Sequence, residues 1–115
     1  MVTLYGISNC DAVRKAKAWF SEHHVAYEFV DYKKHGAPAD KLRLWANDKG
    51  WEALCNKRGT TWRKLSDAQK AQVVDTESAI AIMVAEPSLI KRPVVESNSE
   101  LLVGFDAQTY QQHLL

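Results

Sequence analysis

A single cysteine, Cys10, stands between an apolar stretch and a helical pattern, in the segment Ser-Asn-Cys-Asp-Ala-Val-Arg. Unpaired N–H groups and about half a positive charge gather at the N-terminus of a helix. Both stabilise a thiolate and lower the pKa of a cysteine placed there. Arg14 follows four residues later on the same helical face and adds a positive charge within reach. These residue types at this spacing predict a nucleophilic thiolate at Cys10.

A packed structural cysteine is the alternative for Cys10, because free cysteines are among the most buried residue types. The neighbouring residues argue against it: Ser8 and Asn9 are polar and loop-forming, and Asp11 follows. A polar loop at the carboxyl end of a strand is where α/β sheets place their functional sites. We therefore favour the reactive cysteine and include Asn9 among the residues that line its site.

The partner thiol of a Cys-x-x-Cys motif is absent, because Val13 occupies its position. A disulfide within this motif is excluded, and a redox cycle needs either an outside thiol or Cys55. Cys55 ends the apolar segment Trp51–Cys55, which favours a packed and unreactive thiol. A resolving role for Cys55 stays open, and it requires the two sulfur atoms to approach each other closely.

Two further segments carry residues that bind anions. Asn56–Lys64 is the densest basic stretch and contains Arg58 and no acidic residue. We expect it to form a loop, which either faces solvent or binds an anion, since a guanidinium binds a carboxylate or oxyanion in a bidentate manner. Arg92 precedes Pro93 at the start of a strand. A trans proline at a sheet edge and a cis proline beside the cysteine loop are both open.

The hydrophobic pattern indicates which elements position these residues. Alternation predicts strands at 2–5 and 26–32, and apolar residues at helical spacing predict a helix over 11–23. A strand, a helix and a strand in this order form a βαβ unit with a parallel pair of strands. Cys10 is therefore expected at the junction between the first strand and the helix.

The rest of the chain is predicted to form a helical insertion, a hairpin and a final helix. Proline, glycine and capping residues bound the short helices, which we expect at 38–50, at 51–56, from Ser66 onward and at 77–86. The hairpin is expected at 93–103 with Ser97-Asn98-Ser99 at its tip, and the last helix at 105–115. We predict a single α/β domain over 1–115, with the helical insertion at about 37–87.

Composition and charge exclude several classes of function. The chain has 115 residues and a formal net charge of +1, so no overall field favours nucleic acid or an anionic membrane. Its apolar runs are too short to span a bilayer, and Met1–Tyr5 lacks the pattern of a signal peptide. Its four histidines and two cysteines show no metal-ligand spacing. We expect a cytoplasmic monomer that binds no metal, nucleic acid or membrane.

Three motifs, "LYGISNCDAVRKA", "LCNKRGTTWRKL" and "PSLIKRPVV", together resemble the arsenate reductase-like (ArsC) family. The subgroup that the chain most resembles is the small YffB-like proteins, which are related to the regulator Spx. The resemblance implies a thioredoxin-like fold, a mixed four-stranded sheet with an inserted helical subdomain. It also implies that Cys10 is the nucleophile and that Arg92 lies beside a cis Pro93 and close to the cysteine.

The chain departs from the arsenate reductases at the residues that hold the oxyanion. In those enzymes two further arginines help to hold the oxyanion. By in-line matching the first falls on Asn56, for which Arg58 would substitute, and the second falls near Gly104, where this sequence has no arginine. A doubly charged oxyanion needs several positive donors, so the arsenate site is weakened. Spx-type regulators often carry Cys-x-x-Cys, which is absent here, and this lowers the expectation of an RNA-polymerase-binding regulator.

A glutathione-dependent monothiol reductase is the leading hypothesis. The Cys10 thiolate would attack an oxidised substrate, and glutathione would resolve the product through a mixed disulfide. Arg14, Arg58 and Arg92 would hold the thiolate and the glutathione carboxylates, and the backbone before Pro93 would pair with the peptide. Glutathione is expected as a co-substrate, and no bound cofactor is expected.

Two other hypotheses are kept open. An arsenate reductase would use the same cysteine on arsenate, with electrons from glutathione. A non-catalytic, Spx-like interaction protein would instead present a surface around Trp62 with Arg58, Arg63 and Lys64.

Overall fold

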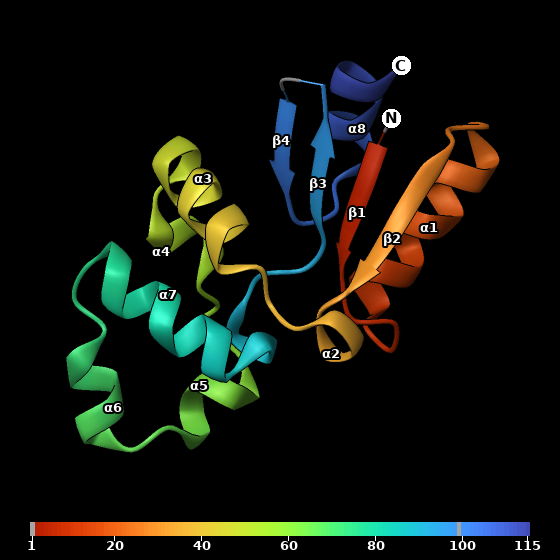
Figure 1. Ribbon diagram of the computed structural model, residues 1–115. Coiled ribbons are helices and arrows are strands. Elements are labelled where there is room, and N and C mark those ends of the chain that lie inside the picture. The colour runs from red at the N-terminus through yellow and green to blue at the C-terminus, as the bar shows by residue number, and fades with distance from the viewer. Residues whose placement is uncertain (1, 99) are drawn as a thin grey trace. The chain divides into compact units, whose positions relative to one another are not determined.

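Segments from both ends of the chain build one four-stranded sheet, as Figure 1 shows for this computed structural model, which describes residues 2–98 and 100–115. The strands, in the order β2-β1-β3-β4, are β1 (Val2–Gly6), β2 (Tyr27–Asp31), β3 (Val94–Ser97) and β4 (Glu100–Val103). β1 pairs in parallel with β2 and antiparallel with β3, which forms a hairpin with β4. The predicted mixed four-stranded sheet is confirmed.

The chain divides into a sheet unit and a helical unit. The sheet unit combines Met1–His35 with Arg92–Leu115, and the helical unit is Gly36–Lys91. The insertion expected at about 37–87 falls within the helical unit. No helix in the described ranges is long and apolar enough to cross a membrane.

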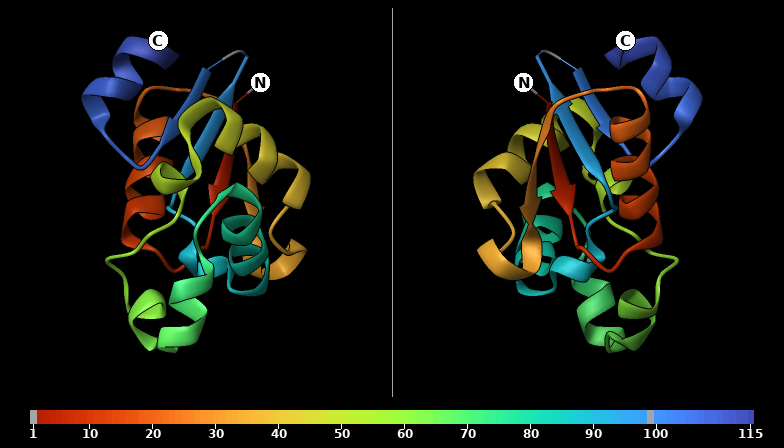
Figure 2. Two further views of the ribbon diagram at one scale, coloured as in Figure 1. Left: turned by 90° about the vertical axis from the view of Figure 1, so that its left-hand side faces the viewer. Right: turned by 90° about the vertical axis from the view of Figure 1, so that its right-hand side faces the viewer.

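Two helices cover one face of the sheet in the sheet unit, and Figure 2 shows them along the same side. In α1 (Asp11–Glu22), the buried residues recur at helical spacing, and they are Val13, Ala16, Trp19 and Phe20. α8 (Ala107–Leu114) contributes Tyr110, which packs edge-on against Trp19 at 5.4 Å between ring centroids. Asp106 caps α8 by accepting the N–H groups of its first turn, as its position in the sequence predicts.

The helical unit consists of short helices stabilised by caps and by ion pairs. They are α3 (Ala39–Lys49), α4 (Trp51–Leu54), α5 (Thr60–Lys64), α6 (Asp67–Gln72), α7 (Thr76–Ala85) and the 3-10 turn η1 (Pro87–Leu89). Capping boxes begin α6 at Ser66 and α7 at Asp75. Arg43 of α3 donates to both carboxylate oxygens of Glu77 in α7, at 3.2 and 3.1 Å.

The basic stretch Asn56–Lys64 was expected to be a loop, and this is wrong for its second half, which forms α5. The Arg63 N–H donates to the Gly59 carbonyl at 3.3 Å, and the Arg63 guanidinium donates to the Arg58 carbonyl at 2.8 Å. A single helical turn is too short to show an apolar period, which is why the pattern predicted none. The same reason applies to α2 (Tyr32–His35), which follows β2 directly. Of the predicted hairpin tip, Ser99 lies outside the described residues, as does Met1.

Candidate active site

Cys10 is the N-cap residue of α1, in the loop that leaves the end of β1. The Cys10 carbonyl accepts the Arg14 N–H at 3.0 Å, and the Cys10 N–H donates to the Ile7 carbonyl at 3.3 Å, which closes the loop into a turn. Gly6 lets α1 approach the strand closely, because a Cβ there would lie 2.7 Å from Val13 Cγ2. The predicted position of the cysteine at a helix start is confirmed.

Several donors converge on the half-buried Cys10 thiol and favour its ionised form. Burial on its own raises the pKa of the thiol. Hydrogen bonds from the Val13 N–H, the Arg92 side chain and the Ala12 N–H outweigh burial, and with the charge of Arg92 they lower the pKa below its usual value. The site therefore favours a thiolate at the N-terminus of a helix, which is the form that attacks disulfides.

Arg92 reaches Cys10 from the other end of the chain. The Arg92–Pro93 peptide bond is cis, as the resemblance implied. Pro93 is buried, and its carbonyl accepts the Gly104 N–H at 2.7 Å, so the start of β3 is fixed to the end of β4. The arrangement gives the thiolate a guanidinium partner, and charge-assisted hydrogen bonds of this kind are stronger than neutral ones.

The two remaining predicted residues of the sheet unit are exposed. The Arg14 guanidinium forms an ion pair with the Asp11 carboxylate one turn earlier on α1. The charge that lowers the pKa of Cys10 comes from Arg92. Asn9 is exposed in the loop beside the cysteine. Substrate binding by Arg14 and Asn9 stays a prediction.

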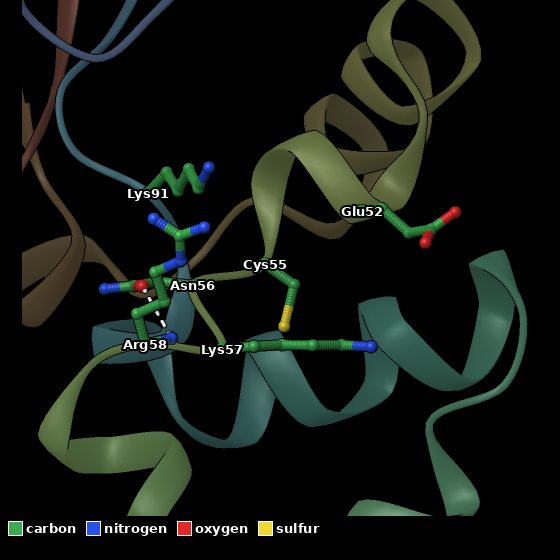
Figure 3. A pocket seen from close by; sticks show the side chains of 6 residues that line it. All are labelled: Glu52, Cys55, Asn56, Lys57, Arg58 and Lys91. Atoms are coloured by element: carbon green, nitrogen blue, oxygen red, sulfur yellow. Dashed lines mark hydrogen bonds between the residues drawn. The ribbon is translucent and has the colours of Figure 1, made fainter.

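Arg58 lies in the helical unit, where it lines a basic pocket of about 340 Å³ (Figure 3). The other lining residues are Glu52, Cys55, Asn56, Lys57 and Lys91. Hydrogen bonds from the Asn56 N–H to the Leu89 carbonyl and from the Lys91 N–H to the Leu54 carbonyl, each 2.7 Å, join its two walls. The pocket carries positive side chains that suit a carboxylate or another small anion. A role for Arg58 at Cys10 stays a prediction.

Cys55 is packed in this pocket, with 2% of its surface exposed. Burial raises the pKa of the Cys55 thiol, although the charges of Lys57 and Lys91 act against the rise. Lys57 lines the same pocket (Figure 3), and its ammonium lies over the rings of Trp51 and Trp62 at 4.9 and 5.4 Å. Cys55 therefore has the unreactive environment that its apolar segment predicted.

Sequence reasoning missed Lys91 in the pocket and Asp31 beside the cysteine loop. Lys91 reaches the pocket through the bridge between Cys55 and Ile90, a pairing that no local pattern indicates. Asp31 is a charged residue at the end of an apolar strand, and its type alone was a usable signal, since charged residues are rarely buried without partners. Over residues 2–98 and 100–115, no group of three metal-ligating side chains comes together.

The ArsC family model matches residues 5–113. The chain belongs to the ArsC family. A solved structure named YFFB protein is 47% identical, with each chain covered completely and a TM-score of 0.95. The solution structure of an ArsC-related protein from Brucella melitensis is 43% identical over 98% of this chain and 93% of that one, with a TM-score of 0.75. The global transcriptional regulator Spx of Staphylococcus aureus is 29% identical over 99% of this chain and 87% of the regulator.

Membership of the ArsC family agrees with the resemblance carried by the three sequence motifs. The match spans both Cys10 and Arg92, so the two residues that meet at the candidate active site lie within the family's common region. The relatives differ in their named functions, which include a transcriptional regulator and an arsenate reductase-related protein. The chemistry of this ArsC-family member must therefore be argued from its own site.

Proposed function

We propose that this ArsC-family protein is a thiol-dependent reductase in which Cys10 is the nucleophile and glutathione supplies the electrons. The observation that carries the proposal is the convergence of the Val13 N–H, the Arg92 side chain and the Ala12 N–H on the Cys10 sulfur. These groups lower the pKa of the thiol and leave it half-exposed, and nucleophilic attack requires both an accessible sulfur and its thiolate form.

The reaction cycle needs one protein thiol. The Cys10 thiolate attacks a disulfide between a substrate thiol and glutathione, forms a mixed disulfide with glutathione, and releases the reduced substrate as its thiolate. A second glutathione thiolate attacks the mixed disulfide, regenerates the Cys10 thiolate and leaves as oxidised glutathione. Two electrons pass from glutathione to the substrate. Val13, in place of a second cysteine, is consistent with this monothiol route.

Positive side chains would hold the glutathione portion of the substrate. Arg92 stabilises the Cys10 thiolate before attack and the thiolate that leaves afterwards. Arg14 and Arg58 would bind the glutathione carboxylates, as a guanidinium fits a carboxylate in a bidentate manner. The backbone before Pro93 would pair with the peptide. The basic pocket around Arg58 carries positive side chains, whose charges are opposite to those of the glutathione carboxylates.

The proposal is tested by the pH dependence of Cys10 alkylation and by thiol turnover. The alkylation rate should follow a thiolate whose pKa lies clearly below the usual value of about 8.5. Incubation with oxidised glutathione should add one glutathione to Cys10, as located by mass spectrometry, and turnover of a glutathione mixed disulfide should disappear in Cys10→Ser. An ordinary Cys10 pKa, or modification of Cys55 alone, would contradict the proposal.

Arsenate reduction is a second candidate, favoured by the 43% identity to an ArsC-related protein from Brucella melitensis. Against it, Asn56 and Gly104 occupy positions at which a further cationic donor was expected from the resemblance. A cell-free assay with arsenate, glutathione and glutaredoxin separates the two reactions. Arsenate turnover that requires Cys10 and exceeds disulfide turnover would reverse our ranking.

A binding role without catalysis is supported by the identity to Spx but not by the surface expected for it. Trp62 is half-buried and covered by Lys57, and the Arg63 guanidinium binds the Arg58 carbonyl. A partner captured equally by wild type and Cys10→Ser, with no thiol turnover in either, would favour binding over catalysis.

A further inference from the structure

Asp31 is a buried carboxylate at the carboxyl end of β2, next to the start of the cysteine loop. It is the one buried charged residue within residues 2–98 and 100–115, with 6% of its surface exposed. In the parallel pair of β1 and β2, Asp31 is the register partner of Gly6, the last residue of β1. A buried charge is costly unless it is hydrogen-bonded, so the partners of Asp31 indicate what it does.

The Asp31 carboxylate accepts hydrogen bonds from two segments of the chain. The Lys33 N–H donates to Oδ1 at 2.8 Å, and the Ser8 hydroxyl donates to Oδ2 at 3.3 Å. Burial raises the pKa of Asp31, but the Lys33 N–H, the Ser8 hydroxyl and the Lys34 N–H, with the charge of Lys34, outweigh burial and lower it. Asp31 is therefore ionised at neutral pH and links the end of β2 to Ser8.

Ser8 belongs to the loop that sets the position of the Cys10 sulfur. At the start of this loop Gly6 packs on Val13 and Ile7 is buried, and at its end the Cys10 N–H closes a turn onto the Ile7 carbonyl. Ser8 itself is exposed, and its hydroxyl donates a hydrogen bond to Asp31. That bond holds the middle of the loop against the sheet.

We propose that Asp31 is a positioning residue for the Cys10 nucleophile. Through the Ser8 hydroxyl it fixes the loop, so that the Cys10 sulfur stays within hydrogen-bond distance of its donors. The inference rests on the proposed function of Cys10. Asp31 would act on the sulfur indirectly, through its hydrogen bond from Ser8. Two N–H groups of α1 and the Arg92 side chain converge on the Cys10 sulfur. A displacement of the loop that lengthens these three contacts therefore weakens all of them together.

Positioning and simple electrostatics predict opposite changes in the Cys10 pKa. A nearby negative charge disfavours a thiolate, so if Asp31 acted by its charge alone, removing it would lower the pKa of Cys10. If Asp31 positions the loop, removing its hydrogen bonds moves the Cys10 sulfur away from its hydrogen-bond donors and raises the pKa of Cys10. The sign of the change therefore distinguishes the two roles.

The experiment measures the Cys10 pKa from alkylation rates across pH in wild type and in four variants. Asp31→Ala and Ser8→Ala should both raise it, and a rise of about one unit lowers the alkylation rate at acidic pH about tenfold. Asp31→Asn should not raise the Cys10 pKa, because its amide still accepts the Lys33 N–H and donates to Ser8. Glu28→Ala, an exposed acid in the same strand, is the matched control and should change nothing.

Three results would overturn the inference. In the first, the Cys10 pKa of wild type lies below the usual value, and neither Asp31→Ala nor Ser8→Ala raises it above that of wild type. This result leaves the proposed function intact. Another is an equal rise in Asp31→Asn and Asp31→Ala. The third, an ordinary pKa in wild type, overturns the proposed function as well. If Asp31→Ala does not fold, the Cys10 pKa of Ser8→Ala decides the question. That variant should fold, because it loses only one exposed hydroxyl.

Discussion

At the residue scale, opposing effects act on the Cys10 thiol, and their balance decides its chemistry. Burial disfavours the thiolate, and the N–H groups at the start of α1 and the Arg92 side chain favour it. The N-terminus of α1 does not account for the whole lowering of the Cys10 pKa, because Arg92, the side-chain donor, comes from a distant segment of the chain. Cys55 shows the contrast, because burial is there the dominant effect and raises the pKa. Two thiols of one chain thus differ through their surroundings.

Removing Arg92 should raise the Cys10 pKa, because the thiolate loses both a hydrogen bond and a fixed positive charge. We expect Arg92→Ala to slow Cys10 alkylation at neutral pH about tenfold or more, with the rate recovering as the pH is raised. The measurement is the alkylation rate as a function of pH, with the modified residue located by mass spectrometry.

Arg14→Ala is the comparison for Arg92→Ala, since Arg14 is an exposed arginine paired with Asp11. It should shift the Cys10 pKa much less, because exposed ion pairs are weak and screened by salt. Equal shifts in the two variants would mean that general positive charge, and not the contact with Arg92, controls the thiol.

At the element scale, the start of α1 combines a close approach to β1 with the N-cap that carries the cysteine. Gly6 and Val13 are the residues in contact at this approach. Local sequence predicted α1 well, because Val13, Ala16 and Phe20 recur at helical spacing. It did not predict α2 and α5, because single turns have no period. The contact of Arg92 with Cys10 came only from family resemblance, since no local rule relates residues so far apart.

Gly6→Ala should destabilise the protein by about 1–3 kcal/mol, because the added methyl would lie 2.7 Å from Val13 Cγ2 and force α1 away from the strand. The free energy of unfolding in urea measures this effect. Val13→Ala removes the obstructing methyl groups, so the double variant should be less destabilised than the sum of the two single variants. If the destabilisation of the double variant equalled the sum for the two single variants, the added methyl of Gly6→Ala would not be in conflict with Val13 of α1.

At the scale of the whole molecule, buried tyrosines connect stability to alkaline pH. Burial raises the pKa of Tyr5, Tyr32 and Tyr110, and for Tyr5 a 2.8 Å hydrogen bond to Glu96 adds to the rise. In the unfolded chain tyrosine ionises near pH 10, roughly. The stabilisation from these groups is therefore complete below about pH 10 and is lost as the pH rises further.

The free energy of unfolding should fall steeply above about pH 10, and less steeply in Tyr32→Phe. Tyr32 is the informative position because its buried hydroxyl has no hydrogen-bond partner in the described part of the chain. Its removal should therefore leave the neutral-pH stability unchanged or higher. Tyr110→Phe loses a 2.8 Å bond to the Gly104 carbonyl and should cost about 1 kcal/mol at neutral pH. An alkaline slope in Tyr32→Phe equal to that of wild type would contradict this assignment.

The strand order has a consequence for synthesis on the ribosome. β1 pairs with β3, which is translated well after β1 because the helical unit lies between the two strands in the sequence. Until residues 92–97 emerge, a nascent chain has one edge of β1 unpaired, and Cys10 lacks its guanidinium partner. The thiol thus acquires its full reactivity only after Arg92 has emerged, which limits premature disulfide exchange by the unfinished polypeptide.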